Sequence, residues 1–207
     1  MVKFILVRHG LTTSNKTRRA QGHYDSQLDE IGIRQAACTA EHIANTYHID
    51  AIYASDLSRT RDTAAPIAKL LNLPVHTDAA LREVNIGDWE NRLVADIERE
   101  DPENRAKFKN DIGNFRYPNG ETFSETQARA LDCIKRIAAA HDGETVLVVT
   151  HGGVIQVLLC AWTGTPISEI RSLKEFKNTS ITVAEYEGDA VTLLSIGEVE
   201  HLPKELL

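Results

Sequence analysis

The sequence predicts an α/β fold built on a mostly parallel sheet. Through the first 160 residues, short apolar runs alternate with longer segments of helical period, as in chains whose parallel strands are joined by helices. The composition, with 42% hydrophobic and 26% charged residues, is that of an ordinary globular protein. Because no linker rich in proline or glycine divides the chain, residues 1–207 are expected to form a single domain.

The expected strands are short apolar runs bounded by polar or turn-forming residues. Four of them precede or alternate with helical segments, at Lys3–Val7, Ala51–Ala54, Val75–Thr77 and Thr145–Thr150. Near the end of the chain, Ser180–Glu187 and Ala190–Ile196 flank Gly188-Asp189. This arrangement predicts an antiparallel hairpin with a two-residue turn.

The expected helices carry apolar residues at spacings of three and four. Asp29 caps the first of them, and Thr122 with Glu125 forms a capping box for the third. Pro66 lacks an amide hydrogen and is expected to kink or break the second helix. The four segments begin at Gly32, Asp56, Thr122 and Val154, and the last three end near Leu71, Ala140 and Trp162.

One stretch lacks a clear period. Residues from Arg99 to Gly120 are rich in charge, asparagine and glycine, which predicts a mobile helix or a loop. We therefore expect residues 82–120, taken as a whole, to form an insertion that covers the active site at one end of the sheet.

Charge and composition exclude several classes of partner. The formal net charge of −7 provides no general attraction for nucleic acid or an anionic membrane. No run of 18 apolar residues predicts a membrane span, and the first apolar stretch is too short for a signal peptide. The three cysteines lie far apart and show no CxxC spacing, which favours reduced thiols in a cytoplasmic protein.

Polar residues follow the expected strands at the point where each strand ends. The segments are Arg8-His9-Gly10, Ser55 to Arg61, Leu81-Arg82-Glu83 and His151-Gly152-Gly153. In an open parallel sheet, ligands bind outside the carboxyl ends of the strands. We therefore expect five side chains to meet at one edge, namely Arg8, His9, Arg59, Glu83 and His151.

This set of residue types suits phosphoryl transfer to a histidine. Two arginines and two histidines form a cationic pocket, and the planar guanidinium matches phosphate oxygens. Glycines after the histidines expose backbone N–H groups to an anion, and the carboxylate of Glu83 can exchange protons. The GxGxxG, Walker A, GxSxG and HExxH motifs are absent, and no Asp and His cluster has the ligand spacing of a metallophosphatase.

With these residues in view, the chain resembles the histidine phosphatase superfamily, in its cofactor-dependent phosphoglycerate mutase-like branch. The resemblance runs almost end to end. Its motifs are Val7-Arg8-His9-Gly10 with Thr12 and Asn15, Gln21-Gly22, Ser55-Asp56-Leu57-Ser58-Arg59-Thr60, Leu81-Arg82-Glu83, Gly120-Glu121-Thr122, Val149–Gly152 and His201-Leu202. The fold it implies is a three-layer α/β/α sandwich.

The resemblance also implies roles for individual residues. His9 is the nucleophile, Glu83 the proton donor and acceptor, and Arg8, Arg59 and His151 hold the phosphoryl oxygens. Substrate contacts are implied for Asn15, Gln21, Gly22, Arg61 and Gly152. Arg61 equally suits a surface ion pair, since it lies two residues beyond Arg59 on the same helix. No metal ion and no other cofactor is implied.

Phosphatase and mutase share all these residues, and differ in whether water or a phosphoglycerate hydroxyl attacks the phosphohistidine. The short segments after Trp89-Glu90 and after His201 favour the phosphatase, with the mutase as the alternative. A binding module without turnover would be expected to lack His9, Glu83 or an arginine. The expected partner is a small phosphorylated metabolite, with selectivity assigned to Tyr24 and residues 91–119, and a homodimer is allowed.

Overall fold

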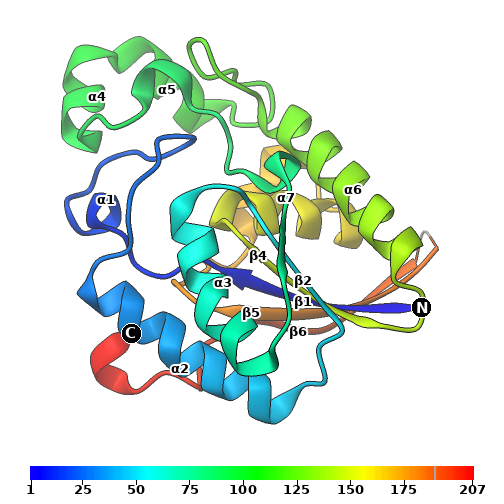
Figure 1. Cartoon of the computed structure of the whole chain (residues 1–207). Coiled ribbons are helices and arrows are strands. Elements are labelled where there is room, and N and C mark those ends of the chain that lie inside the picture. Colours follow the sequence, from blue (N-terminus) through cyan, green and yellow to red (C-terminus); the bar gives the residue numbers. More distant parts are fainter. Residues whose placement is uncertain (189) are drawn as a thin grey trace.

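A six-stranded sheet lies at the centre of the fold in the computed structural model, which describes residues 1–188 and 190–207 (Figure 1). The strand order is β3-β2-β4-β1-β5-β6. The strands are β1 (Val2–Arg8), β2 (Ala51–Ala54), β3 (Val75–Thr77), β4 (Thr145–Thr150), β5 (Ile181–Glu187) and β6 (Ala190–Glu198). Strands β3, β2, β4 and β1 run parallel, whereas β5 and β6 are antiparallel additions. The predicted mostly parallel sheet is therefore confirmed.

Helices connect the strands and cover both faces of the sheet. They are α1 (Thr13–Lys16), α2 (Glu30–Thr46), α3 (Ser58–Leu71), α4 (Val94–Glu100), α5 (Pro102–Asn110), α6 (Phe123–Ala140) and α7 (Gly152–Thr163). The two predicted caps are confirmed. The Asp29 carboxylate accepts from the Gly32 N–H at 2.8 Å, and Thr122 and Glu125 each accept from the other's backbone N–H, at 3.1 and 2.9 Å.

Pro66 does not break α3, which was one of the two expected effects, because the helix continues from Ser58 to Leu71. The carbonyl group that loses its hydrogen-bond donor at this position belongs to Asp62, four residues earlier. Asp62 is exposed, so water can satisfy this carbonyl. The cost of the proline is therefore smaller than it would be on the buried face of the helix.

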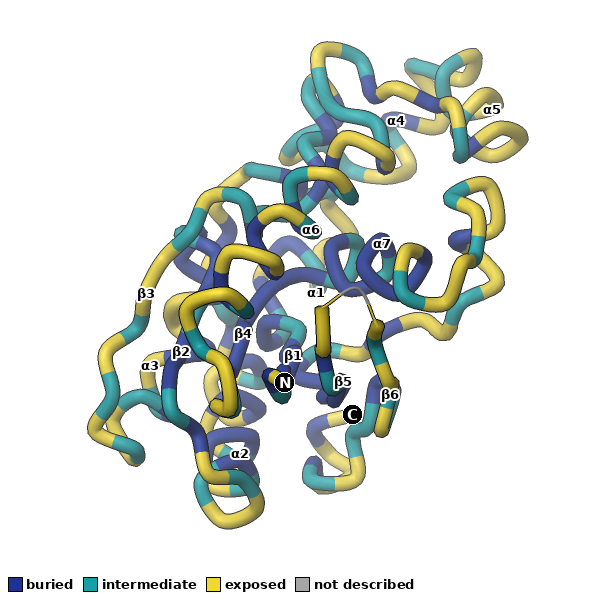
Figure 2. The backbone as a smooth tube through the Cα atoms, turned by 90° about the vertical axis from the view of Figure 1, so that its right-hand side faces the viewer, coloured by how far each residue is buried: buried dark blue, intermediate teal, exposed yellow. Residues whose placement is uncertain are grey.

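Alternating residues of the central strands point to opposite layers. Phe4 and Leu6 of β1 pack in a core with α6 and α7, whereas Ile5 and Val7 pack in a second core with α2 and α3. All four side chains are fully buried, and each such burial contributes about 1.5–3 kcal/mol. Figure 2 shows the buried strands between these helical layers. The expected three-layer sandwich is confirmed.

Residues 99–120 contain more regular structure than the sequence predicts. They include the end of α4 and the whole of α5, which precede a turn-rich segment up to Gly120. A third cluster of buried side chains joins this region to α6 and α7. Its aromatic members include Trp89, Phe115, Tyr117 and Phe123.

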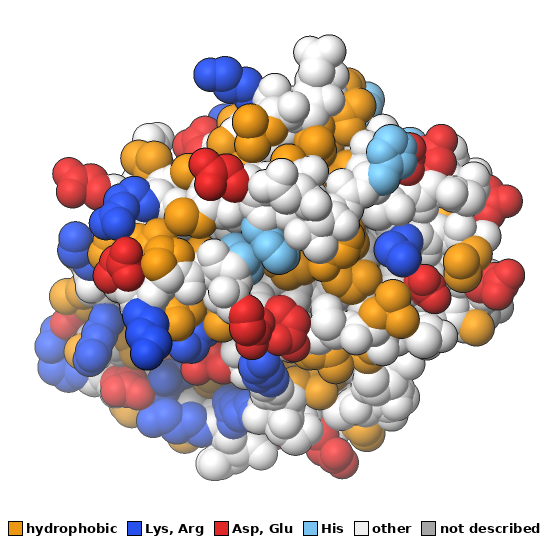
Figure 3. Space-filling model, turned by 90° about the horizontal axis from the view of Figure 1, so that it is seen from below, with side chains coloured by type: hydrophobic (Ala, Val, Ile, Leu, Met, Phe, Trp, Pro, Cys, Tyr) orange, Lys and Arg blue, Asp and Glu red, His pale blue; other side chains and the backbone are white. Residues whose placement is uncertain are grey.

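The predicted hairpin is confirmed by the antiparallel pairing of β5 with β6. Gly188 of the expected turn has a φ of +62°, and Asp189 lies outside the described residues. Across the described chain, none of the helices has the length and apolar character to span a membrane. On the face seen in Figure 3, acidic and basic side chains are interspersed with apolar ones, so no single sign of charge covers it.

Candidate active site

Strands β1 and β4 end side by side and bring two histidines to the same edge of the sheet. Arg8 is in register with Thr150, and the His9 N–H donates to the Thr150 carbonyl at 3.0 Å. The Thr150 hydroxyl donates to the carbonyl of Leu81 at 2.8 Å, which ties the segment before Glu83 to the same point. The four segments that follow strands therefore meet, as the topology of a parallel sheet requires.

His9 is held in one tautomer. Its Nδ1 lies 2.8 Å from the Gly10 carbonyl, and a carbonyl can only accept, so Nδ1 carries the hydrogen. Nε2 then keeps its lone pair. The side chain is 2% exposed, and burial, followed by the charges of Arg59 and Arg8, lowers the pKa of His9 well below 6.5. The imidazole is therefore neutral at physiological pH, as a nucleophile requires.

His151 takes the opposite tautomer. Its Nδ1 accepts from Nε of Arg59 at 3.2 Å, so the hydrogen is on Nε2. Nε2 is buried and has no partner among the described residues. The His151 ring lies edge-on to the His9 ring, with 5.2 Å between their centroids. Burial and the nearby Arg59 lower the pKa of His151 well below 6.5, and a donor N–H remains at the site.

Arg59 is fully buried and organises the loop after β1. Its two terminal nitrogens donate to the carbonyls of Tyr24 and Gly22, at 2.9 and 2.8 Å. Burial lowers the pKa of Arg59 to about 10, which leaves the guanidinium charged at neutral pH. Of its five N–H groups, three are used by these contacts and His151, and two remain for a ligand.

Arg8 lies against the first turn of α7. Its Nη1 donates to the carbonyl of Phe176, whereas its buried Nε has no partner among the described residues. A Cβ placed on Gly152 would lie 3.5 Å from this Nε, so the guanidinium passes close to the start of the helix. The backbone N–H groups in the first turn of a helix are free of intrahelical bonds and favour anions.

Glu83 places its carboxylate between two backbone donors. Oε1 accepts from the N–H of Val84 at 3.0 Å, and Oε2 accepts from the N–H of Gly153 at 3.2 Å. A Cβ on Gly153 would lie 2.3 Å from Oε1, so the carboxylate needs a glycine at this position. The sequence places Gly153 in the segment after His151 and gives its N–H to an anion, but it does not predict the contact with Glu83.

Asn15 lies beside the site at the start of α1. Its Oδ1 accepts from the N–H of Thr12 at 3.2 Å, which closes a capping box. No hydrogen bond joins the amide Nδ2 to another described residue, and Asn15 lines a cavity together with Arg8. Gln21 lies nearby, because its Oε1 accepts from the Thr12 hydroxyl at 2.9 Å.

Two predicted substrate contacts are placed differently from the rest. Gly22 has a φ of +53°, and its carbonyl accepts from Arg59, so its observed contact is with the loop and not with the open site. Arg61 is exposed, while Arg59 on the same helix is fully buried. Within the described chain, no hydrogen bond or ion pair joins Arg61 to the cluster.

A cavity of about 390 Å³ adjoins Arg8 and Asn15. Its other walls come from the segment before β5 and from the last residues of the chain, including Lys177, Asn178 and Leu206. Asn178 also donates to the His9 carbonyl at 2.9 Å. Lys177, Asn178 and Leu206 lie near the end of the chain, far in sequence from Arg8 and Asn15. The sequence alone therefore did not place them beside these residues.

The aromatic residues expected to govern selectivity serve different purposes. Phe115 and Tyr117, from the segment 91–119, are 5% and 6% exposed and pack in the third core cluster. Phe108 packs against the same cluster, between Arg105 and Arg171. Tyr24 is 41% exposed and remains accessible beside Arg59.

Within residues 1–188 and 190–207, no group of three or more His, Cys, Asp or Glu side chains is arranged to hold a metal ion.

A sequence profile of the histidine phosphatase superfamily (branch 1) matches residues 4–199. The chain belongs to this superfamily, and the resemblance inferred from its motifs is confirmed. The match covers all five clustered side chains, from Arg8 to His151.

Individual relatives agree with this assignment. The chain is 32% identical over 204 residues to a metal-independent phosphoserine phosphatase of Arabidopsis thaliana, covering 98% of this chain and 84% of the relative. It is 37% identical over 210 residues to GpmB of Yersinia pestis, a probable phosphoglycerate mutase, covering 98% and 95% respectively. The solved structure of Bacillus stearothermophilus YhfR has a TM-score of 0.92 at 34% identity, covering 97% of this chain and 99% of that chain.

Proposed function

We propose that this protein is a metal-independent phosphatase that hydrolyses a small phosphomonoester through a phosphohistidine. The observation that carries the proposal is the cluster of buried His9, Arg59 and His151 and half-buried Arg8, with the Glu83 carboxylate beside it. Membership of the histidine phosphatase superfamily supports it, as does the metal-independent phosphatase among the relatives.

In the first step, the lone pair on Nε2 of His9 attacks phosphorus, and the bond from phosphorus to the ester oxygen breaks. Glu83, in its acid form, transfers its proton to that oxygen, so an alcohol leaves. In the second step, Glu83 takes a proton from water, and the water oxygen attacks the phosphohistidine. The phosphorus–nitrogen bond then breaks, which releases phosphate and restores neutral His9.

The remaining polar groups stabilise negative charge during both steps. The guanidinium groups of Arg8 and Arg59 and the Nε2–H of His151 would hold the phosphoryl oxygens. Asn15, through Nδ2, and Gly152, through its backbone N–H, would add two neutral donors. Gln21, Gly22 and Arg61 stay predicted substrate contacts.

The substrate is proposed to be a small phosphorylated metabolite. The metal-independent phosphoserine phosphatase among the relatives is named for a compound of this kind, which supports the proposal. A single domain over residues 1–207, the insertion at residues 82–120, a cytoplasmic location and a homodimer stay predictions. Light scattering on the purified protein measures its molar mass in solution and so tests the homodimer.

The experiment that tests the proposal uses His9→Ala. The wild-type protein should release phosphate from phosphoserine, glycerol phosphate or phosphoglycerate, and should form a phosphohistidine that is labile in acid. The folded variant should do neither, because the attacking nitrogen is gone. Substantial turnover by a folded His9→Ala protein would contradict the assignment of the nucleophile.

A mutase is the second candidate, favoured by the GpmB relative at 37% identity. Its phosphohistidine would pass the phosphoryl group to a phosphoglycerate hydroxyl instead of water. Incubation with phosphoglycerate and a bisphosphoglycerate primer distinguishes the two. Isomerisation faster than phosphate release would identify a mutase, and net release of phosphate would identify a phosphatase.

A further inference from the structure

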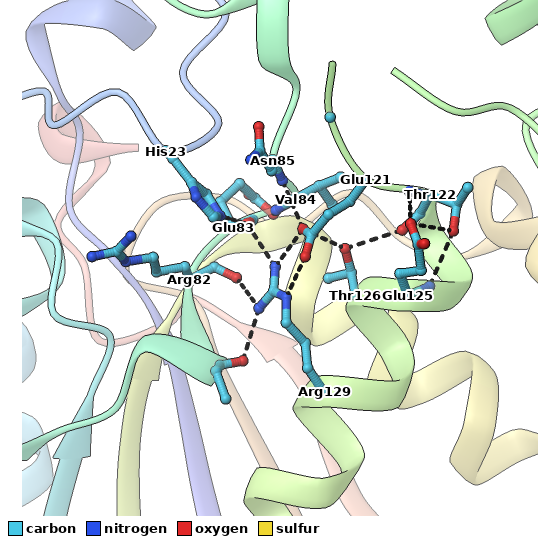
Figure 4. Close-up of polar contacts among 12 residues, drawn as sticks. His23, Arg82, Glu83, Val84, Asn85, Glu121, Thr122, Glu125, Thr126 and Arg129 are labelled. Carbon is cyan, nitrogen blue, oxygen red and sulfur yellow. Dashed lines mark hydrogen bonds and ion pairs between the residues drawn. The ribbon is translucent and has the colours of Figure 1, made fainter. Parts of the chain in front are cut away.

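Arg129, on α6, uses all five of its guanidinium N–H groups to hold the segment that carries Glu83. Its Nη1 donates to the carbonyls of Ala80 and Arg82, at 2.8 and 2.7 Å, and its Nη2 donates to the carbonyl of Glu83 at 2.8 Å. The remaining two donors, on Nε and Nη2, bind the Glu121 carboxylate, both at 2.9 Å. Figure 4 shows the guanidinium directed at these acceptors.

Glu121 holds the other side of the same segment. Its Oε2 accepts from the N–H of Asn85 at 2.9 Å, while its own backbone N–H donates to the Asn85 carbonyl at 2.8 Å. Burial opposes ionisation of Glu121, but hydrogen bonds led by Arg129 outweigh it, and the pKa of Glu121 is lowered. The ionised pair therefore fixes the backbone on both sides of Glu83 (Figure 4).

The position of this backbone decides where the Glu83 carboxylate lies. One carboxylate oxygen accepts from the N–H of Val84, which is part of the held segment, and the other accepts from Gly153 on α7. A shift of the segment would move the first donor while the second stayed in place. The carboxylate would then lose one contact or turn away from the site.

Two further side chains hold the segment from the opposite side. His23 lies with Nε2 at 2.8 Å from the Glu83 carbonyl, and Arg82 forms a two-pronged ion pair with Asp56, at 2.7 and 2.5 Å. Arg129 differs from both because it binds three backbone carbonyls of the segment. It is also paired with the Glu121 carboxylate, which holds the N–H of Asn85.

We propose that Arg129, tied down by Glu121, is a positioning residue for proton transfer by Glu83. This inference rests on the proposed function, in which Glu83 gives a proton to the leaving oxygen. An alkoxide leaves only with that proton, whereas nitrophenolate leaves without help. Loss of Arg129 should therefore slow alkyl esters selectively.

The experiment compares kcat/KM for an alkyl ester with kcat/KM for nitrophenyl phosphate. The alkyl ester is phosphoserine, or whichever of glycerol phosphate and phosphoglycerate is turned over faster. Both constants report the steps up to release of the alcohol or phenol, so hydrolysis of phosphohistidine does not enter. In Arg129→Met, we expect about a 10- to 100-fold loss with the alkyl ester, which is the scale of a misplacement near 1 Å. With nitrophenyl phosphate, the loss should stay within about threefold, because nitrophenolate needs little proton transfer.

Arg136 provides the matched control. It lies on the same face of α6, seven residues after Arg129, and is ion-paired with Asp78 at 3.0 Å and with Asp132 at 3.2 Å. Its contacts do not reach the Glu83 carbonyl, so Arg136→Met should leave the ratio of the two kcat/KM values unchanged. Arg129→Lys, which keeps the charge but cannot match the five-donor geometry, should give an intermediate ratio.

If circular dichroism shows that Arg129→Met is unfolded, the two kcat/KM values are compared in Arg129→Lys and Glu121→Gln instead. An equal loss with both substrates in the folded variants, or no loss, would overturn the positioning role. Glu83→Gln distinguishes this failure from failure of the proposed function. A selective loss in Glu83→Gln without one in the Arg129 variants overturns the inference alone, whereas an equal loss in Glu83→Gln overturns the proton-donor role and the inference together.

Discussion

Gly153 and Glu83 are in direct contact across the site. The Gly153 N–H donates to one carboxylate oxygen at 3.2 Å, and a Cβ on Gly153 would lie 2.3 Å from the other oxygen. The glycine belongs to the first turn of α7, where its φ is negative and any residue can follow the same backbone. The conflict of a larger residue is therefore with Glu83 and not with the helix.

Gly153→Ala should lower kcat/KM for an alkyl phosphate by about 10- to 100-fold, since the carboxylate must move by roughly 1 Å to avoid the methyl group. The stability of the fold should change little, because the gain of about 1 kcal/mol from alanine's higher helix propensity offsets the cost of displacing Glu83. Steady-state kinetics and thermal unfolding measure the two effects. An active variant with wild-type kcat/KM would show that Glu83 does not need its observed position.

Glu83→Gln should lose about 10²–10⁴-fold with an alkyl phosphate, the usual contribution of general acid catalysis. Glutamine keeps the size of Glu83 and one acceptor oxygen for the backbone contacts, but it cannot donate that proton at neutral pH. The pre-steady-state burst of nitrophenol from nitrophenyl phosphate should fall much less. Equal losses would assign Glu83 to binding or folding instead of proton transfer.

Phosphate release should survive exhaustive treatment with EDTA. The positive charge that phosphoryl transfer requires is available from Arg8 and Arg59, both largely buried at the site, and from the Nε2–H of His151. Activity is measured before and after chelation, with a magnesium-dependent phosphatase as the control. Loss of activity on chelation and recovery with magnesium or manganese would place this protein in a different mechanistic class.

Acid should destabilise the fold between neutral pH and pH 5. Burial lowers the pKa values of His9 and His151 well below 6.5 in the folded state, so below about pH 6.5 the unfolded chain binds protons that the folded chain does not. The free energy of unfolding should therefore fall as pH falls, by at most about 1.4 kcal/mol per pH unit for each histidine. Urea unfolding at a series of pH values measures the slope.

One variant separates this effect from the titration of other groups. His151→Asn removes one of the two buried imidazoles and should flatten the slope. A wild-type slope in His151→Asn would contradict the buried-histidine explanation.

Features encoded by neighbouring residues could be predicted from the sequence. Asp29 and Thr122 cap their helices through contacts three residues away, and His9 and His151 follow apolar runs long enough to identify as strands. The ends of parallel strands meet by topology alone, so the cluster followed from strand positions.

Features that depend on distant packing could not be predicted in the same way. Arg129 has the sequence context of a surface charge on an amphipathic helix, and its role emerges only where α6 passes the Glu83 segment. The contact between Gly153 and Glu83 joins residues that are 70 positions apart. Helix α4 has seven residues and one fully buried apolar side chain, Ile97, so its periodicity is too short to detect.

The position of β1 in the sheet has a consequence for biosynthesis. It is translated well before its neighbours β4 and β5, which begin at Thr145 and Ile181. A nascent chain shorter than these positions exposes an apolar strand with both edges unpaired, and His9 has no Thr150 carbonyl to bind. If His9 is the nucleophile, as proposed, its chemistry has to wait until β4 and β5 have been translated, and a chain terminated before them would be both inactive and prone to aggregate.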